Sequence, residues 1–194
     1  MTGTMTTKAK LRKQLRANRA EHAAAQPEAI RALLFKQPPA PLRALVPEGT
    51  TIGLYHASGD EAPAAAYARY FSEAGHTVAL PRLTARDAAM EFAVHTDPFG
   101  ETDLEIGPFG IMQPATDAET VTPEVIFAPL LGFTAYGHRI GQGAGHYDRW
   151  LAAHPDTTAI GMAWDAQLVE SLPTEPHDQA MTAIVTPTRL YGPF

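Results

Sequence analysis

The stretch Thr51–Leu80, TIGLYHASGDEAPAAAYARYFSEAGHTVAL, decides the fold class of this chain. It opens with an apolar run rich in strand formers, TIGLYHA, and closes on the start of a second run, HTVALPRL. Between the two runs, Glu61 to about Ala74 has the composition of a helix. A strand, a helix and another strand in this order favour parallel strands joined by a crossover helix.

Further runs extend the same alternation toward the C-terminus: MEFAVHT, VIFAPLLGF, TAIGMAW and AIVTPTRL, with a short helix around Tyr147 to Ala153. Their nearly continuous apolar character is typical of strands that are covered on both faces. The sequence therefore predicts an α/β fold with three layers, in which helices flank a mostly parallel sheet.

Two helices are expected before the sheet, from Thr7 to about Ala25 and from Pro27 to Lys36. A chain of 194 residues with 45% hydrophobic content can bury one sizeable core. We therefore expect a single domain over residues 1–194, in which the helices of residues 1–36 pack on the sheet.

Composition narrows the possible partners. The net charge of −6 argues against a general nucleic-acid binder, which needs a basic surface. The absence of cysteine excludes disulfides, thiolate zinc sites and thiol nucleophiles. There is no apolar run of the ~20 residues that a membrane span needs and no secretory signal pattern. We expect a monomeric cytoplasmic protein with small-molecule partners, and no nucleic acid or membrane among them.

The segment PLLGFTAYGHRIGQGAGHYDRWL, Pro129–Leu151, carries the strongest chemical signal. A predicted buried strand leads into a loop with several glycines and then into a helix, an arrangement that places backbone N–H groups and a helix N-terminus around an anion. Arg139 can pair with phosphate oxygens and Asp148 can hold magnesium. The loop is not a Walker or dinucleotide motif, and a tight structural connector is the alternative interpretation.

Two other features allow a functional and a structural interpretation. Lys8, Arg12, Arg16 and Arg19 form one stripe of the first helix, which is either a solvated face or a set of cations that includes phosphate ligands. Glu61 follows TIGLYHA at the expected start of a helix. Its carboxylate either stabilises that helix N-terminus or accepts N–H groups of a heterocycle.

Five motifs in the right order resemble those of the 5-formyltetrahydrofolate cyclo-ligase family, also called methenyltetrahydrofolate synthetases. They are K-x-x-L-R from Lys8, Glu61, LEIGPFGIMQP from Leu104, GHRIGQGAGHYDRWL from Gly137, and LPTEPHD from Leu172. The resemblance covers nearly the whole chain. It implies an α/β fold and a reaction of 5-formyltetrahydrofolate, with or without a polyglutamate chain, with magnesium and ATP. The products are 5,10-methenyltetrahydrofolate, ADP and phosphate, formed through a phosphorylated formyl intermediate.

The resemblance also implies roles for individual residues. Catalysis would involve Arg139, His146 and Tyr147, and Asp148 would hold magnesium. The residues expected to bind ATP are Lys8, Arg12, Arg139, Gly141, Gln142, Gly143, Ala144, Gly145 and Tyr147. The residues expected to bind the folate are Tyr55, Glu61, Gln142 and His146. Glu175, His177 and Asp178 match a motif near the site without an assigned role, and a structural part for Asp178, ordering a loop, is equally consistent.

Four residues depart from the common pattern of that family: Thr134, Ala144, His146 and Thr182. His146 stands where a tyrosine is frequent, so pH dependence or substrate preference can differ. Three alternatives therefore stay open beside the cyclo-ligase. They are a non-catalytic folate- or nucleotide-binding paralogue, an isomerase or transferase acting on a phosphorylated sugar or an acyl-coenzyme A, and RNA binding through the basic first helix.

Overall fold

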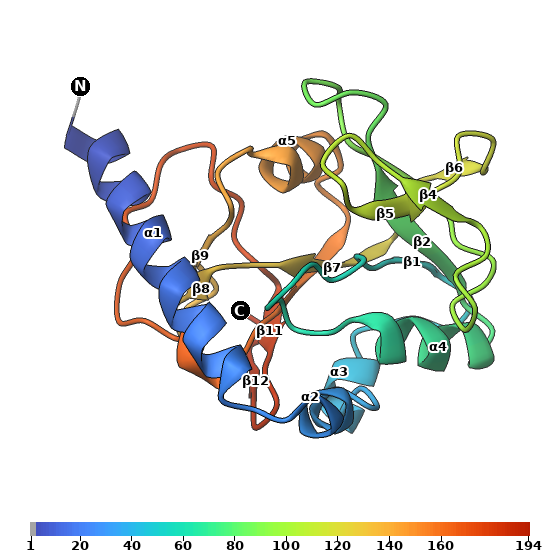
Figure 1. Cartoon of the computed structure of the whole chain (residues 1–194), viewed down its shortest axis with the longest axis horizontal. Coiled ribbons are helices and arrows are strands. Elements are labelled where there is room, and N and C mark those ends of the chain that lie inside the picture. Colours follow the sequence, from blue (N-terminus) through green and yellow to red (C-terminus); the bar gives the residue numbers. More distant parts are fainter. Residues whose placement is uncertain (1–2) are drawn as a thin grey trace.

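A computed structural model describes residues 3–194 and places an eight-stranded sheet at the centre of the protein (Figure 1). In spatial order its strands are β12 (Leu190–Tyr191), β11 (Ala183–Val185), β10 (Thr158–Met162), β7 (Val125–Pro129), β1 (Thr51–Gly53), β2 (Thr77–Arg82), β3 (Glu91–Val94) and β6 (Thr120–Val121). The five strands from β11 to β2 are parallel to one another. The predicted α/β class with a mostly parallel sheet is confirmed.

Two strand predictions were wrong in detail. The MEFAVHT run forms β3, which pairs antiparallel with β2, in register Arg82↔Glu91. Only residues 83–90 connect the two strands, too few for the crossover of a dozen or more residues that a parallel pair requires. The VIFAPLLGF run divides into β7 and β8 (Gly132–Phe133), and β8 forms a separate hairpin with β9 (Arg139–Ile140).

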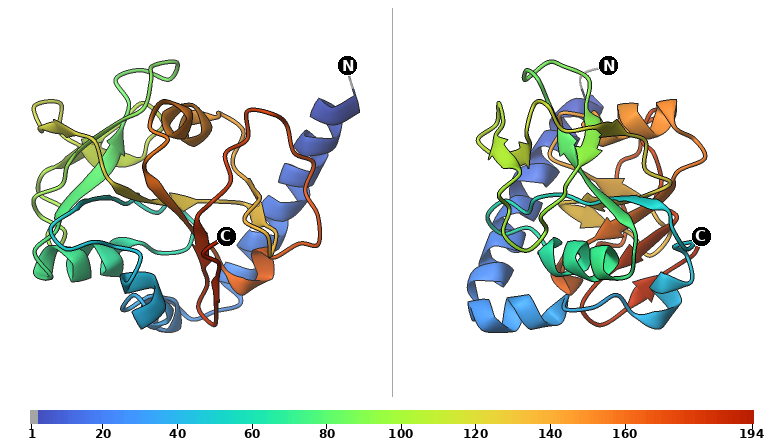
Figure 2. Two further views of the ribbon diagram at one scale, coloured as in Figure 1. Left: turned by 180° about the vertical axis from the view of Figure 1, so that it is seen from behind. Right: turned by 90° about the vertical axis from the view of Figure 1, so that its right-hand side faces the viewer.

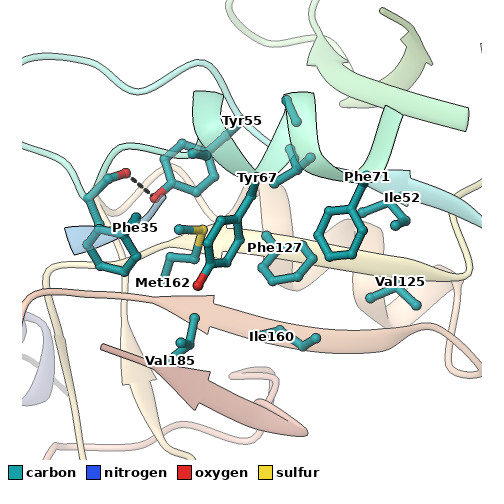
Figure 3. Close-up of a cluster of buried hydrophobic side chains, with 14 of the residues drawn as sticks. Phe35, Ile52, Tyr55, Tyr67, Phe71, Val125, Phe127, Ile160, Met162 and Val185 are labelled. Atoms are coloured by element: carbon teal, nitrogen blue, oxygen red, sulfur yellow. Dashed lines mark hydrogen bonds between the residues drawn. The ribbon is translucent and has the colours of Figure 1, made fainter. Parts of the chain in front are cut away.

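Helices cover both faces of the sheet (Figure 2). On one face lie α4 (Ala65–Glu73) and the short helices α2 (Glu28–Leu34) and α3 (Ala40–Arg43), and α5 (His146–Ala153) lies on the other. In the core beneath α4, Tyr67 and Phe71 pack on Phe127 of β7, with ring centroids 5.7 and 5.6 Å apart (Figure 3). Trp150 of α5 packs on Phe92 from the opposite side.

Helix α1 (Gly3–Ala24) lies at one end of the molecule, beside the β8–β9 hairpin and the 3-10 helix η1 (Asp165–Gln167) (Figure 1). Its Leu15 is buried against Leu131 and Ile140. A second hairpin, β4 (Leu104–Ile106) with β5 (Met112–Pro114), lies beside β2 at the other end. No helix within residues 3–194 is long and apolar enough to cross a membrane.

The helix expected from Glu61 begins later, at Ala65. Pro63 explains the difference, because a proline disfavours the helical conformation of the residue before it and is tolerated only at a helix start. Residues 58–64 therefore form an irregular segment at the carboxyl end of β1. Glu61 lies in this segment, outside the helix, and lines a cleft.

Candidate functional site

A cleft of about 600 Å³ opens at the carboxyl ends of β1 and β7, between α1, the β9–α5 loop and the β4–β5 hairpin. In parallel α/β sheets this edge is where ligands bind. The cleft is lined by every residue for which the sequence predicted a binding or catalytic role: Lys8, Arg12, Tyr55, Glu61, Arg139, Gly141, Gln142, Gly143, Ala144, Gly145, His146, Tyr147 and Asp148. Segments from both halves of the chain thus converge on one site.

The glycine-rich loop takes a backbone shape that needs its glycines. Gly143 has φ +113° and Gly145, the N-cap of α5, has φ +69°, conformations that residues with a side chain rarely adopt. A Cβ on Gly143 would lie 3.4 Å from the guanidinium carbon of Arg12. No side chain of the described residues caps α5, so its first N–H groups and its dipole are available to an anion in the cleft.

The cationic stripe of α1 is only in part a solvated face. Lys8 is 4% exposed, and its Nζ lies 2.7 Å from carboxylate oxygens of both Glu175 and Asp178. Arg12 donates from Nε to the carbonyl oxygen of Gly141 at 3.1 Å. Arg16 is exposed and bonds the side chain of Gln142.

Arg19, the last member of the stripe, was given no role from the sequence and is also 4% exposed. It pairs with Asp60 at 2.8 Å and lies 3.7 Å from Glu61, so it ties α1 to the segment after β1. Sequence reasoning missed this contact because residues 41 positions apart in the chain carry no local pattern that relates them. The interpretation as a solvated face was wrong for Lys8 and Arg19.

An ion pair spans the glycine-rich loop. Arg139 Nη2 donates to Asp148 Oδ1 at 2.8 Å, and the same oxygen accepts the N–H of Gln179 at 3.1 Å. The Nε atom of Arg139 is buried and has no hydrogen-bond partner within residues 3–194. The Nε atom of Arg19 is unpaired in the same way. Arg139 differs in its position at the glycine-rich loop, where its guanidinium and the backbone N–H groups together favour an anionic ligand such as a phosphate.

The LPTEPHD motif builds a cluster of possible metal ligands next to Lys8. Glu175, His177 and Asp178 offer ligand atoms that lie within 4.8 Å of one another. Asp178 also accepts the N–H of Glu175 at 2.6 Å, which orders this loop as expected for a structural role. Burial alone would raise the pKa of Asp178, but the hydrogen bonds from Lys8 and Glu175 outweigh it and lower that pKa.

Glu61 is held with its carboxylate mostly buried. Its Oε2 accepts the N–H of Ser58 at 2.9 Å. Burial raises the pKa of Glu61 above its usual value, although Ser58 and Arg19 favour the charged form. A carboxylate in such a place is suited to accept N–H groups of a ligand, since burial strengthens a hydrogen bond that is made there.

Aromatic side chains occupy the floor and one side of the cleft. Tyr55 is buried, donates to the carbonyl oxygen of Ala62 and has a pKa raised well above the usual value by burial and then by Glu61 (Figure 3). Burial also raises the pKa of Tyr147, so both phenols stay neutral. Burial, then Arg149, lowers the pKa of His146, whose Nε2 is buried without a partner among the described residues.

An apolar wall completes the cleft, and no role was predicted for it. It is built from β2, the β2–β3 connection and the β4–β5 hairpin, by Pro81, Leu83, Met90, Phe109 and Ile111. Phe109 is 43% exposed and faces the His146 ring edge-on, with centroids 6.0 Å apart. The LEIGPFGIMQP motif contained the signal, but sequence alone does not show that its apolar residues face a site rather than the core.

Two of the four departures from the common family pattern lie outside the cleft lining. Thr134 is buried beside β8 and Thr182 accepts the N–H of Ala159. Ala144 and His146 line the cleft. Only these two substitutions are therefore placed to contact a ligand directly.

The fold and the cleft define an α/β protein whose ligand site, at the carboxyl ends of parallel strands, joins a glycine-rich loop and cations to an apolar wall. The model of the 5-formyltetrahydrofolate cyclo-ligase family matches residues 4–187. The chain belongs to this family.

Individual members of this family are similar to the chain in sequence and in structure. The chain is 32% identical over 182 residues to the 5-formyltetrahydrofolate cyclo-ligase of Mycolicibacterium smegmatis, covering 91% of this chain and 93% of that one. It is 36% identical over 124 residues to the Escherichia coli K12 protein of the same name, covering 61% and 67%. The solved structure of Aquifex aeolicus 5,10-methenyltetrahydrofolate synthetase is similar, with a TM-score of 0.73 and 26% identity over 94% of this chain and 93% of that one.

Proposed function

We propose that this protein converts 5-formyltetrahydrofolate and ATP to 5,10-methenyltetrahydrofolate, ADP and phosphate, supported by Mg²⁺. The family supports the folate reaction. The single observation that favours a second, phosphorylated substrate is the guanidinium of Arg139 at the glycine-rich loop, whose buried Nε has no hydrogen-bond partner within residues 3–194.

The cleft offers groups that suit both substrates of such a reaction. Positive charge and N–H donors for phosphates come from Arg12, Arg139, the loop from Gly141 to Gly145 and the N-terminus of α5. Apolar side chains and the buried carboxylate of Glu61 suit a flat heterocycle with N–H donors.

The proposed chemistry needs little beyond position and charge. The formyl oxygen attacks the γ-phosphorus as the bond to ADP breaks. The second folate nitrogen then attacks the activated carbon and loses its proton, and the carbon–oxygen bond breaks as phosphate leaves. Arg139 and Arg12 would stabilise the charge that develops on the transferred phosphoryl group. Glu61, Tyr55 and Gln142 would orient the folate, with His146 and Tyr147 beside the reacting groups.

The residues of the site also fit a magnesium ion. Both hydrogen bonds that Asp148 accepts from residues that the structure describes use Oδ1, and its side chain is 21% exposed at the cleft. Its other oxygen is therefore suited to a hydrated ion. When bound, magnesium would neutralise phosphate charge. Lys8, which was expected to bind ATP directly, would act from its position between Glu175 and Asp178 and keep these carboxylates from repelling the nucleotide.

The test is a near-ultraviolet absorbance assay for the methenyl product, with purified protein, 5-formyltetrahydrofolate and Mg²⁺, with and without ATP. Product that appears only with ATP, with one ADP formed for each folate converted, supports the proposal. Tight binding of both compounds by folded protein without product would instead indicate a non-catalytic binding protein.

A pair of arginine variants, one in the cleft and one outside it, tests whether turnover depends on the cleft. Arg139→Gln removes the charge at the loop and should lower turnover by at least about tenfold. Arg43→Gln, which removes an exposed arginine of α3 that bonds Tyr70, serves as the control and should leave turnover unchanged. Equal losses in both variants would argue against a phosphate site at Arg139.

A further inference from the structure

The guanidinium of Arg19 lies where three segments of the fold meet. Its side chain comes from the C-terminal half of α1 and is buried although it carries a charge. Nη2 donates to Oδ1 of Asp60, in the segment after β1, at 2.8 Å. Nη1 donates to the carbonyl oxygen of Leu130, directly after β7, at 3.4 Å. A buried charge is costly unless it is paired and hydrogen-bonded, so these partners are what hold Arg19 in this position.

The same guanidinium attracts the carboxylate of Glu61. Nη1 of Arg19 lies 3.7 Å from Oε1 of Glu61, close enough for an ion pair and too far for a hydrogen bond. The Glu61 side chain is only 10% exposed, so solvent weakens this attraction little. Arg19 therefore holds the carboxylate by charge without using its capacity to accept a hydrogen bond from a ligand.

The segment that carries Glu61 depends on such contacts for its position. Residues 58–64 form no helix or strand, so no regular backbone ladder fixes their direction. Asp60 is anchored twice, through its side chain by Arg19 and through its carbonyl oxygen by Nε1 of Trp164 at 2.9 Å. Because Glu61 is the next residue, fixing Asp60 also limits where the Glu61 carboxylate can lie.

The groups around Glu61 act on its charge in opposite directions. Arg19 of α1 favours the ionised carboxylate and Asp60 of its own segment opposes it. Tyr55, after β1, and Tyr147, of α5, also face Glu61, but burial raises the pKa of both phenols and they stay neutral. Gln142 of the glycine-rich loop adds a hydrogen bond to the carboxylate. The balance between Arg19 and Asp60 is thus one that single substitutions can change in either direction.

We infer that Arg19 is a positioning residue for the folate, which holds the Glu61 carboxylate in the cleft through its charge and through its bond to Asp60. The inference rests on the proposed function, because it takes Glu61 to accept N–H groups of the folate. Arg19 acts through Glu61 and needs no contact of its own with the ligand. Its loss should therefore affect folate binding in a way that follows the protonation of Glu61.

The experiment measures the dissociation constant of 5-formyltetrahydrofolate by calorimetric titration, without ATP, over a series of pH values. In the native protein this constant should rise as the pH falls and Glu61 becomes protonated. Arg19→Met removes the cation and keeps a long side chain, and it should weaken binding about tenfold at neutral pH. Because the ionised Glu61 loses its support, the rise with falling pH should also begin at a higher pH than in the native protein.

Asp60→Asn provides a change of the opposite sign. It keeps the size of the side chain and an oxygen that can accept from Arg19, but it removes the negative charge that opposes ionisation of Glu61. The rise of the dissociation constant should therefore begin at a lower pH than in the native protein. Both variants disturb the same Arg19–Asp60 pair, so a purely structural contact would change binding in the same direction in both. Asp60→Asn also tests the inference alone if Arg19→Met does not fold.

The control is Arg43→Met, which removes an exposed arginine outside the cleft and should keep the native constants at every pH. Titration of the ligand and of the cleft histidines is common to all the proteins and does not affect the comparison. Shifts in the same direction for Arg19→Met and Asp60→Asn, or no shift in either, would overturn the inference. Weaker binding of Arg19→Met by the same factor at every pH would also overturn it, because Arg19 would then only dock α1.

The inference and the proposed function can fail separately. Product formed by the native protein with ATP, together with folate binding that neither variant shifts, would refute the inference and leave the proposed function standing. Opposite shifts in folate binding without any product would do the reverse. Native protein that is folded and binds no folate would overturn both.

Discussion

Arg139 and Asp148, nine residues apart, close the glycine-rich loop with a hydrogen bond of 2.8 Å from Nη2 to Oδ1. The loop between them contains Gly143 and Gly145, which can adopt positive φ values because they have no side chain. An ion pair at its base limits the conformational freedom that these glycines would otherwise add. The same two groups are those we expect to face phosphate and magnesium, so the loop is organised before a ligand arrives.

The metal role of Asp148 predicts a change in magnesium dependence. Asp148→Asn keeps the size of the side chain and an acceptor for Arg139 but removes the charge that attracts Mg²⁺. We expect the Mg²⁺ concentration that gives half-maximal rate to rise about tenfold, measured by titration at fixed ATP and folate. Asp156→Asn, at an exposed position outside the cleft, is the control. An unchanged titration for Asp148→Asn would remove it from the metal site.

The position of Arg12 at the glycine-rich loop predicts that it contributes to ATP binding. Its Nε bonds Gly141, so Arg12→Ala removes both a cation and a support of the loop. We expect the KM for ATP to rise about tenfold and the KM for the folate to change little. Lys13→Ala, the exposed neighbour on α1, should behave as the native protein. If both variants keep the native KM for ATP, Arg12 has no part in nucleotide binding.

Lys8 predicts a pH-dependent contribution to stability. Burial opposes the charge of Lys8, but Asp178 and Glu175 outweigh it and raise the pKa above 10.5, while the pKa of Asp178 is lowered below 3.8. The ion pair therefore stabilises the fold between these limits. Its contribution is lost as pH falls through the lowered pKa of Asp178, or rises through the raised pKa of Lys8.

Lys8→Met should therefore lower the free energy of unfolding by about 2 kcal/mol at neutral pH, because two carboxylates are left facing each other. The difference from the native protein should shrink as the pH falls through the lowered pKa of Asp178, where this carboxyl becomes protonated. Urea unfolding at neutral pH and at an acidic pH below that pKa measures it. Lys10→Met, at an exposed position of α1, is the control. A difference that is the same at both pH values would mean that packing, and not the ion pair, stabilises this region.

Glu61 predicts a pH dependence of folate binding. Its pKa is raised by burial, so the carboxylate becomes protonated at a higher pH than a free glutamate, whose pKa is 4.5. The charged form is the acceptor for the folate, hence the KM for the folate should rise as the pH falls through the raised pKa. Glu61→Gln should raise this KM about tenfold at neutral pH and remove that part of the pH dependence. Glu73→Gln, exposed at the end of α4, should retain it.

Much of the fold could be predicted because its signals are local. The apolar runs that became β1, β2, β7, β10 and β11 identified the parallel sheet without any knowledge of their partners. The start of α4 and the direction of β3 were missed although their causes, Pro63 and a short connection, are also local. The regular alternation of strands and helices predicts a helix from Glu61 and a parallel strand at β3, but Pro63 and the short β2–β3 connection prevent both.

The site was predicted less completely, for a different reason. The glycine-rich loop can be recognised from one continuous segment of sequence. The pairing of Lys8 with Glu175 and Asp178, by contrast, joins residues at least 167 positions apart. Whether Phe109 and Ile111 face a cleft or a core depends on where the β4–β5 hairpin docks. Such information is held in the tertiary arrangement and in no single stretch of sequence.

The position of α1 has a consequence for how the protein is made. This helix precedes the sheet strands in the chain, yet the carboxylates that hold its Lys8 follow 167 and 170 residues later. During synthesis α1 can already pack on Leu131 and Ile140 and pair with Asp60 before those carboxylates emerge. The two ion pairs of Lys8 form only afterwards, so the anchoring of α1 beside the cleft is completed late in folding.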